Sequence, residues 1–452
     1  MASTTARELH QKPAPHVQQA RVGLLLLFAL LGLSFSSWLG RFPTVREALG
    51  LSTAELGVVL LAGAVGSLIF VTIAGALVEK FGGRTILTVA AFGISIAFFL
   101  EGLGPTIGDV RVLAVGVFLN GAFVALTNVP QNVETAAVER RVGRSILSHF
   151  HAAYSIGAVI GSLIGAACSA LEVPLILQMS VTALLTLVVR LALIPRVVLD
   201  TALHPETRWQ RADQARRSRV EKAEMKAGVL ESNISQGFSA QLKARKQSLG
   251  HALGAWREPR TIFLGLIIFA ASLSEGSANN WLSIAVVDGF GRSEAVGAIT
   301  LGLFLAAMTL VRIFGPRFID TYGRVTVLRI STVASVLGLL SFGLGPHLGF
   351  ALFGVVLWGM GAALAVPIVI SGASDDPLKA AARVSAVSAF ASIASLAAPP
   401  VLGLIAENTG ARIALTTITV FMIASFLVSK SVRPLEPAKP AIPAQHDTPP
   451  PA

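Results

Sequence analysis

The sequence predicts an all-α polytopic membrane protein in which twelve transmembrane helices form two bundles of six. Three observations predict this fold. The 452-residue chain is 53% hydrophobic and only 13% charged, whereas an ordinary soluble domain is about one quarter charged. Its apolar residues gather in runs of the length, roughly 20 residues, that a helix needs to cross hydrocarbon. A short charged stretch also recurs at matching places in the two halves of the chain.

The apolar runs are predicted to be helices because each one is too long for a buried strand. In lipid, a helix satisfies every backbone polar group within its own segment. Taken in order, the predicted spans are residues 22–40, 57–78, 84–103, 112–136, 147–170, 174–195, 260–284, 294–315, 324–344, 348–371, 382–406 and 411–430.

The spans divide six and six around the longest polar stretch, which predicts five regions. We expect a cytoplasmic N-terminal tail (1–21), a first bundle (22–195), a cytoplasmic linker (196–259), a second bundle (260–432) and a disordered Pro-rich tail (433–452). Helix formers and arginines in the linker predict a helix that lies on the membrane surface, with docking of a partner protein as the alternative.

The charge pattern indicates a membrane rather than a nucleic acid as the partner surface. Lys and Arg exceed Asp and Glu by 36 to 25, giving a net charge of +11, but these charges lie between apolar runs, where they meet anionic lipid headgroups. The basic residues favour one face of the membrane. The positive-inside rule therefore predicts a multi-pass protein of the bacterial inner membrane with both termini in the cytoplasm.

The single cysteine, Cys168, excludes an intrachain disulfide and a cysteine-based metal cluster. We expect no metal, no cofactor and no nucleic acid, and we expect a monomer. No His-Glu-x-x-His pair, Gly-x-Ser-x-Gly elbow or phosphate-binding Gly-Lys-Ser/Thr motif is present, which argues against a membrane enzyme.

The repeated charged stretches are GALVEKFGGR (Gly75–Arg84) and GPRFIDTYGR (Gly315–Arg324). Each follows the second span of its half, and glycine permits the very short turn to the third span. An acid here could pair with an arginine of a neighbouring helix and stabilise one arrangement of the two bundles. The predicted conformational gate comprises Gly75, Glu79, Lys80, Gly82, Arg84, Arg312, Asp320, Gly323 and Arg324.

The first of these stretches resembles the loop motif of the major facilitator superfamily, with Glu79 in place of Asp, Lys80 in place of Arg and Gly83 in place of an Arg. Within that superfamily, three stretches resemble a poorly characterised bacterial group related to fucose-permease-type carriers: Gly40–Gly57, Val138–Gly161 and Glu275–Gly291. The resemblance implies transport of a small solute by rocking of the two halves around a central site, usually driven by an ion gradient.

Two acids inside predicted spans are candidates for proton coupling, because an ionisable group in a lipid-crossing helix is costly. Glu275 lies about fifteen residues into the seventh span, more than 20 Å along the axis. Glu134, in the fourth span, is the second candidate. The alternative for both is an ion pair or hydrogen bond that fixes helix packing.

Amides, aromatic rings and hydroxyls in the spans predict a site for a neutral, hydroxyl-bearing solute, although the same groups can serve as hydrogen-bonding links between helices. The predicted substrate-binding residues are Ser37, Trp38, Asn120, Asn128, Asn132, His151, Tyr154, Asn279, Asn280 and Trp281.

Gly157, Gly161 and Gly165 recur every four residues and predict a smooth helix face for close packing. Drug–proton antiporters of the superfamily carry a related pattern with proline, which is absent here. We therefore favour uptake of a sugar-like or other polar metabolite over export of drugs or organic compounds. A membrane sensor that has kept the carrier fold without transporting is a further alternative.

Overall fold

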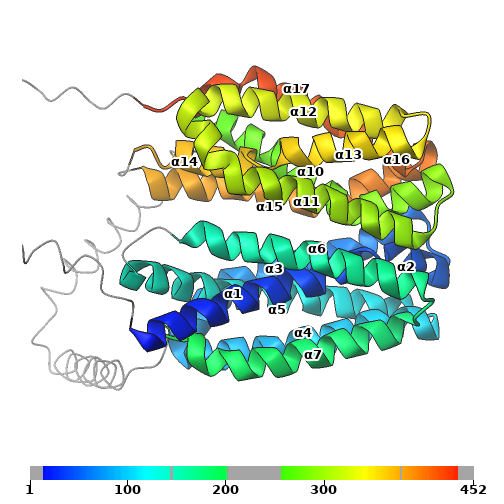
Figure 1. The fold of residues 1–452 in the computed structure, drawn as a ribbon, viewed down its shortest axis with the longest axis horizontal. Helices are drawn as coiled ribbons and strands as arrows, with labels where there is room; N and C mark the ends of the chain where they lie inside the picture. Colours follow the sequence, from blue (N-terminus) through cyan, green and yellow to red (C-terminus); the bar gives the residue numbers. More distant parts are fainter. Residues whose placement is uncertain (1–13, 143–145, 200, 202–255, 377–378, 436–452) are drawn as a thin grey trace, which may run out of the picture.

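The computed structural model describes residues 14–142, 146–199, 201, 256–376 and 379–435. Most of the predicted linker and the predicted Pro-rich tail lie outside these ranges. The described residues of the first half form seven helices, and Figure 1 shows them grouped in its lower part: α1 (Pro15–Leu39), α2 (Phe42–Leu49), α3 (Thr53–Phe81), α4 (Gly83–Ile107), α5 (Val110–Val142), α6 (Leu147–Ala170) and α7 (Leu175–Val197).

The second half lies above the first in Figure 1 and repeats its plan of long, nearly antiparallel helices. Its elements are α10 (Pro259–Phe290), α11 (Glu294–Tyr322), α12 (Arg324–Leu344), α13 (Leu348–Ala362), α14 (Ala365–Ala373), α15 (Ala380–Thr409), α16 (Ala411–Thr416), α17 (Ile418–Leu427) and the 3₁₀ turn η2 (Ser429–Val432).

The predicted fold class is confirmed. Eleven helices of the described chain are long and apolar enough to cross a membrane, and the shorter apolar segment Ala411–Leu427 stands in the place of the twelfth predicted span. The tenth and twelfth spans are each broken into two helices, around Ala363 and at Thr417.

Two features of the first half differ from the prediction. α1 begins at Pro15 rather than at residue 22, because proline is well suited to the first turn of a helix and the polar residues that follow it continue the same turn. α2 was not predicted at all. It is only eight residues long and ends at Gly50, whose φ of 61° is left-handed, so hydropathy over a span-length window does not detect it.

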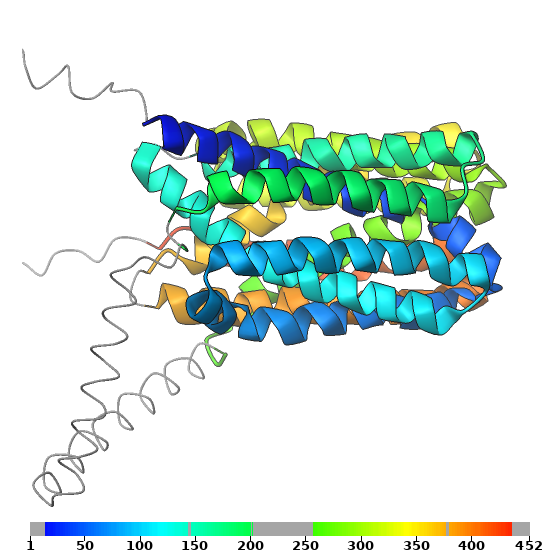
Figure 2. The same cartoon turned by 90° about the horizontal axis from the view of Figure 1, so that it is seen from below.

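The two ends of the molecule differ in what they carry, as Figures 1 and 2 show. We call the end where α1 begins, α7 ends and α10 begins the linker end. The opposite end holds α2, and we call it the α2 end. α3 and α11 both finish at the linker end, so the two repeated charged turns lie on the same side of the bundle.

α1 and α6 make the most extensive helix–helix contact in the structure, and glycines allow it. A Cβ atom on Gly157 would lie 2.0 Å from the carbonyl oxygen of Ala29, and one on Gly161 would lie 2.1 Å from that of Leu33. The α6 backbone therefore lies directly against α1, which fixes the positions of His151 and Tyr154 at the other end of the same helix.

Candidate functional site: a polar cavity below a closed end

A cavity of about 380 Å³ opens in the first half, bounded by four helices. Aromatic and aliphatic side chains form much of its wall, and the polar groups come from α1, α5 and α6. The lining residues are Phe28, Leu31, Ser34, Phe35, Ile94, Phe98, Asn120, Val124, Asn128, Asn132, His151 and Tyr154. An apolar wall with a few converging polar groups is typical of small-molecule sites.

Five predicted substrate-binding residues line this cavity together: Asn120, Asn128, Asn132, His151 and Tyr154. Asn132 donates from Nδ2 to the backbone oxygen of Asn128 at 2.8 Å, which holds these two amides on one face of α5. The His151 ring lies edge-on to Phe28, with 5.6 Å between ring centroids.

The other five predicted substrate-binding residues do not line the cavity. Ser37 is buried and donates to the oxygen of Ser34, while Trp38 is buried edge-on against Phe42. Asn279 and Asn280 are half-buried on α10. Trp281 is buried where α10 meets α15. The two helices are so close there that a Cβ atom added to Gly403 would lie only 3.1 Å from the Trp281 ring.

Glu101, the most deeply buried acid beside the cavity, is a residue that the sequence did not single out. Its side chain is 1% exposed on α4, and its Oε1 accepts a hydrogen bond from Asn120 Nδ2 at 2.9 Å. Its Oε2 is buried and makes no hydrogen bond to any described residue. The predicted span ended at residue 103, so Glu101 read as an ordinary acid at the membrane surface. α4 in fact continues to Ile107.

Glu275 on α10 forms an ion pair with Arg312 on α11, with Oε2 and Nη2 2.8 Å apart. Arg312 also donates from Nε to the backbone oxygen of Ala363. Arg312 is a candidate partner for an acid of the charged turns. In this structure it pairs with Glu275, and its contact with a charged turn stays a prediction. Both charges are near enough to act electrostatically on Tyr154, which lines the cavity, so the pair lies close to this site although neither residue lines it.

Glu134 lies away from the cavity. It is completely buried, and its carboxylate accepts hydrogen bonds from the backbone N–H groups of Leu199 and Thr201 at 2.7 and 2.6 Å and from the Thr201 hydroxyl. The Thr201 oxygen in turn accepts from the Gly83 N–H at 2.8 Å. Glu134 thus ties the segment after α7 to the turn before α4, an arrangement that favours a structural role over proton transfer.

At the α2 end, the two halves are joined by buried polar contacts. Glu294, at the start of α11, forms an ion pair with Arg41 at 2.9 Å and accepts hydrogen bonds from the Thr44 N–H and hydroxyl at 2.8 and 2.7 Å. Arg46 on α2 pairs with Asp288 on α10. All hydrogen bonds and ion pairs identified between described residues of opposite halves lie toward this end, so this end of the molecule is closed.

At the linker end, the two repeated turns share one backbone geometry. Gly82 has φ 81° and ψ 150°, and Gly323 has φ 76° and ψ 156°. In each turn the glycine N–H donates to a carbonyl four residues earlier, Val78 or Ile319, at 2.8 and 2.9 Å. This region of φ and ψ is accessible essentially to glycine alone.

The side chains of the predicted gate are spread around these turns. Glu79, Lys80, Arg84 and Asp320 are exposed, Gly75 is exposed with open space beside its Cα, and Lys80 lies over the Phe81 ring. Because the closed end in this structure is the α2 end, a contact between the two turns would belong to the opposite conformation and stays a prediction.

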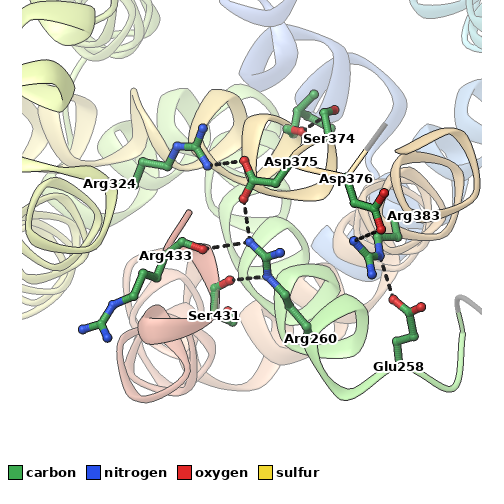
Figure 3. Close-up of polar contacts among 10 residues, drawn as sticks. Glu258, Arg260, Arg324, Ser374, Asp375, Asp376, Arg383, Ser431 and Arg433 are labelled. Carbon is green, nitrogen blue, oxygen red and sulfur yellow. Dashed lines mark hydrogen bonds and ion pairs between the residues drawn. The ribbon is translucent and has the colours of Figure 1, made fainter. Parts of the chain in front are cut away.

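Arg324 belongs to a charged cluster at the linker end of the second half, drawn in Figure 3. Asp375 accepts from both Arg324 and Arg260 at 2.7 Å, and Arg260 also donates to the backbone oxygens of Ser431 and Arg433. Beside it, Glu258 pairs with Arg383 at 2.7 Å. The cluster joins the starts of α10, α12 and α15 to the end of the described chain.

The ion pairs of this cluster hold its carboxyl groups in the charged form. Burial raises the pKa of Asp375, but hydrogen bonds from Arg324 and Arg260 outweigh it and leave the pKa below its ordinary value. A hydrogen bond from Arg383 lowers the pKa of Glu258. The stability that the cluster contributes is therefore present above about pH 4 and is lost as the pH falls through the lowered pKa values.

Within the described ranges, no group of three or more His, Cys, Asp and Glu side chains could hold a metal ion.

The model of the Major Facilitator Superfamily matches residues 24–387, and again residues 264–451. The chain belongs to the major facilitator superfamily. The second match covers the second half alone, as expected if each half is a version of the same six-helix unit.

Among superfamily relatives, the chain is 28% identical to an uncharacterized transporter, y4wD, of Sinorhizobium fredii over 401 residues, which is 88% of this chain and 94% of the relative. The crystal structure of the nucleoside transporter NupG superposes with a TM-score of 0.65 at 15% identity, covering 91% of this chain and 98% of NupG. FucP in its outward conformation gives a TM-score of 0.55 at 15% identity, covering 91% and 99%. Membership of the superfamily and the similarity to a transporter support membrane transport, and the two solved structures support the fold.

Proposed function

We propose that this protein takes up a small, neutral polar solute across the bacterial inner membrane and that a proton gradient drives the uptake. The solute is sugar-like or otherwise hydroxyl-bearing. The observation that carries the proposal is the pairing of a polar cavity with a closed α2 end. A carrier that works by alternating access must hold its site open to one side while contacts between the halves close the other.

The cavity favours an uncharged ligand. Its polar groups are amides, a hydroxyl, an imidazole and a phenol, and the two full charges facing it, Glu275 and Arg312, neutralise each other. Asn128 makes no side-chain hydrogen bond to another described residue, so its amide is available to a ligand. Amides both donate and accept, which suits sugar hydroxyls, and the rings of Phe28 and Tyr154 supply apolar faces.

The linker end is proposed to face the cytoplasm. The basic turn residues Lys80 and Arg84 lie there, together with the charged cluster around Arg260. With the α2 end closed, the conformation is inward-facing. This orientation places both termini inside the cell, in keeping with the positive-inside rule.

Glu275 is the proposed proton-coupling group. Its carboxylate forms an ion pair with Arg312, and addition of a proton would break this pair and release Arg312. The ion pair connects α10 to α11, and Arg312 also connects α11 to the break between α13 and α14. Protonation of Glu275 would therefore weaken contacts among these helices of the second half together.

The test is flux in proteoliposomes that contain the full-length protein under an imposed pH gradient. Radiolabelled xylose and uridine are the neutral probes, with benzoate and ethidium as charged comparators. We expect at least one neutral probe to accumulate when the outside is acidic, and Glu275→Gln to abolish gradient-driven accumulation while leaving exchange without a gradient.

Gradient-driven uptake that persists unchanged in Glu275→Gln would refute the coupling assignment. Efflux of ethidium without transport of either neutral probe would favour an exporter. Binding of a probe without any flux would favour the sensor alternative.

A further inference from the structure

Glu101 and Asn120 form an isolated pair beside the cavity. Glu101 is 1% exposed, and its only hydrogen bond to a described residue comes from Asn120 Nδ2 at 2.9 Å. Burial on this scale is costly for a carboxylate that has no cation beside it. Asn120 is 7% exposed and, unlike Glu101, lines the cavity. The amide is therefore the link between the buried acid and any bound solute.

Among the described residues, no charged side chain forms an ion pair with Glu101. α4 packs against α2, α3, α5 and α7, and no titratable or charged side chain from the described parts of these helices makes a hydrogen bond or ion pair with it. The titratable groups of the cavity itself are His151 and Tyr154 on α6, faced by Glu275 and Arg312 from the second half. Asn120 is consequently the one described residue through which a change in the protonation of Glu101 can affect the cavity.

The amide group of asparagine carries an acceptor, Oδ1, and a donor, Nδ2. The hydrogen-bonding partner of the amide determines which of the two atoms faces the cavity. A carboxylate can only accept, so it holds Nδ2 and leaves Oδ1 for the cavity. A protonated carboxyl group has one O–H to donate, and Asn120 is the only described side chain that hydrogen-bonds to Glu101, so its Oδ1 is a side-chain acceptor for that O–H. Donation to Oδ1 requires the amide to turn over, which brings Nδ2 to the cavity.

We propose that Glu101 is a second proton-responsive group, and that its protonation switches Asn120 from presenting an acceptor to presenting a donor to the solute. This deepens the proposed function and rests on it. One proton from cavity water adds to the carboxylate, and no other bond forms or breaks. A solute whose carbonyl or ring oxygen meets Asn120 then binds with uptake of that proton, whereas a solute that offers only an O–H or N–H there binds with its release.

Infrared difference spectroscopy on the full-length protein in liposomes tests the switch without any ligand. The pH is stepped from about 9 to about 5, a range that spans the shifted values of buried carboxyl groups. We expect the wild type to gain the carbonyl stretch of a protonated carboxyl group and, with ¹³C-labelled asparagine, to show a simultaneous change in a side-chain amide band.

Three variants assign the signals. Glu101→Gln should lose the amide change and the part of the carboxyl band that changes with it, whereas Asn120→Ala should keep that part but shift it to the frequency of an acid without a hydrogen bond. Glu275→Gln should remove only the contribution of Glu275 itself and keep the coupled carboxyl and amide changes. Should Glu101→Gln fold poorly, Asn120→Ala and the labelled amide band still decide the question.

The switch is overturned if Glu101→Gln retains the coupled carboxyl and amide changes, or if Glu101 takes up a proton while the labelled amide band stays fixed. Neither readout depends on transport. Failure of the flux assay would therefore overturn the proposed function and leave this result standing, and the reverse also holds.

Discussion

Single glycines on α6 determine how closely two helices of the first half approach. A Cβ on Gly161 would lie 2.1 Å from the Leu33 oxygen and 2.8 Å from its carbonyl carbon, and backbone atoms cannot give way as a flexible side chain can. We expect Gly161→Ala to destabilise the protein by about 1–3 kcal/mol, the usual cost of overpacking, and to lower the temperature of thermal unfolding.

Gly75→Ala is the matched control, because a Cβ there meets no atom within 4 Å and alanine is the better helix former by about 1 kcal/mol. Its unfolding temperature should equal or exceed that of the wild type. Equal unfolding temperatures for Gly161→Ala and the wild type would contradict the packing argument.

Residues of the cavity were predictable where a polar group interrupts an apolar run. Asn128, His151 and Tyr154 stand out in this way, and the structure brings them together. The ion pair between Glu275 and Arg312 was not predictable, because it joins two helices whose relative rotation depends on packing along their whole length. Glu101 was missed for a simpler reason, since an acid two residues before a predicted helix end is ordinarily a surface residue.

At the scale of elements, the two repeated turns depend on a backbone conformation that only glycine adopts easily. We expect Gly82→Asn and Gly323→Asn each to destabilise the protein by about 1–3 kcal/mol, the cost of such a conformation for other residues. Gly82→Asn should also slow proton-driven uptake of the transported probe, because the turn fixes how α4 follows α3.

Gly50→Asn is the control for these two variants. Gly50 ends α2 with φ 61° and ψ 29°, a left-handed conformation that asparagine tolerates, so its unfolding temperature should change little. If all three variants unfold at the same temperature as the wild type, the turns do not require glycine.

Hydropathy located the long elements well because each needs an apolar run to cross the bilayer. The predicted spans 147–170 and 324–344 coincide with α6 and α12. Hydropathy could not find α2, which lies between the halves, nor the breaks at Ala363 and Thr417, which interrupt apolar runs without changing their composition. Short elements and breaks are determined by tertiary contacts that a single sequence does not display.

At the scale of the whole molecule, the conformation depends on which end holds the two halves together. Arg41 is 4% exposed, so removing the charge of Glu294 leaves a buried guanidinium without its counter-charge. Breaking such a pair costs about 3–5 kcal/mol, and about 1.4 kcal/mol already changes a population ratio tenfold. Only the state with a closed α2 end carries this cost, because Arg41 and Glu294 belong to opposite halves and meet at that end.

We therefore expect Glu294→Gln to shift the protein toward a state in which the α2 end is open. Spin labels on cysteines at Glu47 and Arg292, both exposed, should move apart in a Cys168→Ser background, while labels at Lys80 and Thr321 should approach each other. Asp288→Asn removes the ion pair with Arg46, in which the Asp288 side chain is 33% exposed and the Arg46 side chain 23%. It should change the label distances less, because exposed ion pairs contribute about 0–1 kcal/mol. Unchanged distances in Glu294→Gln would mean that packing between α6 and α11, rather than the buried charge pair, keeps the α2 end closed.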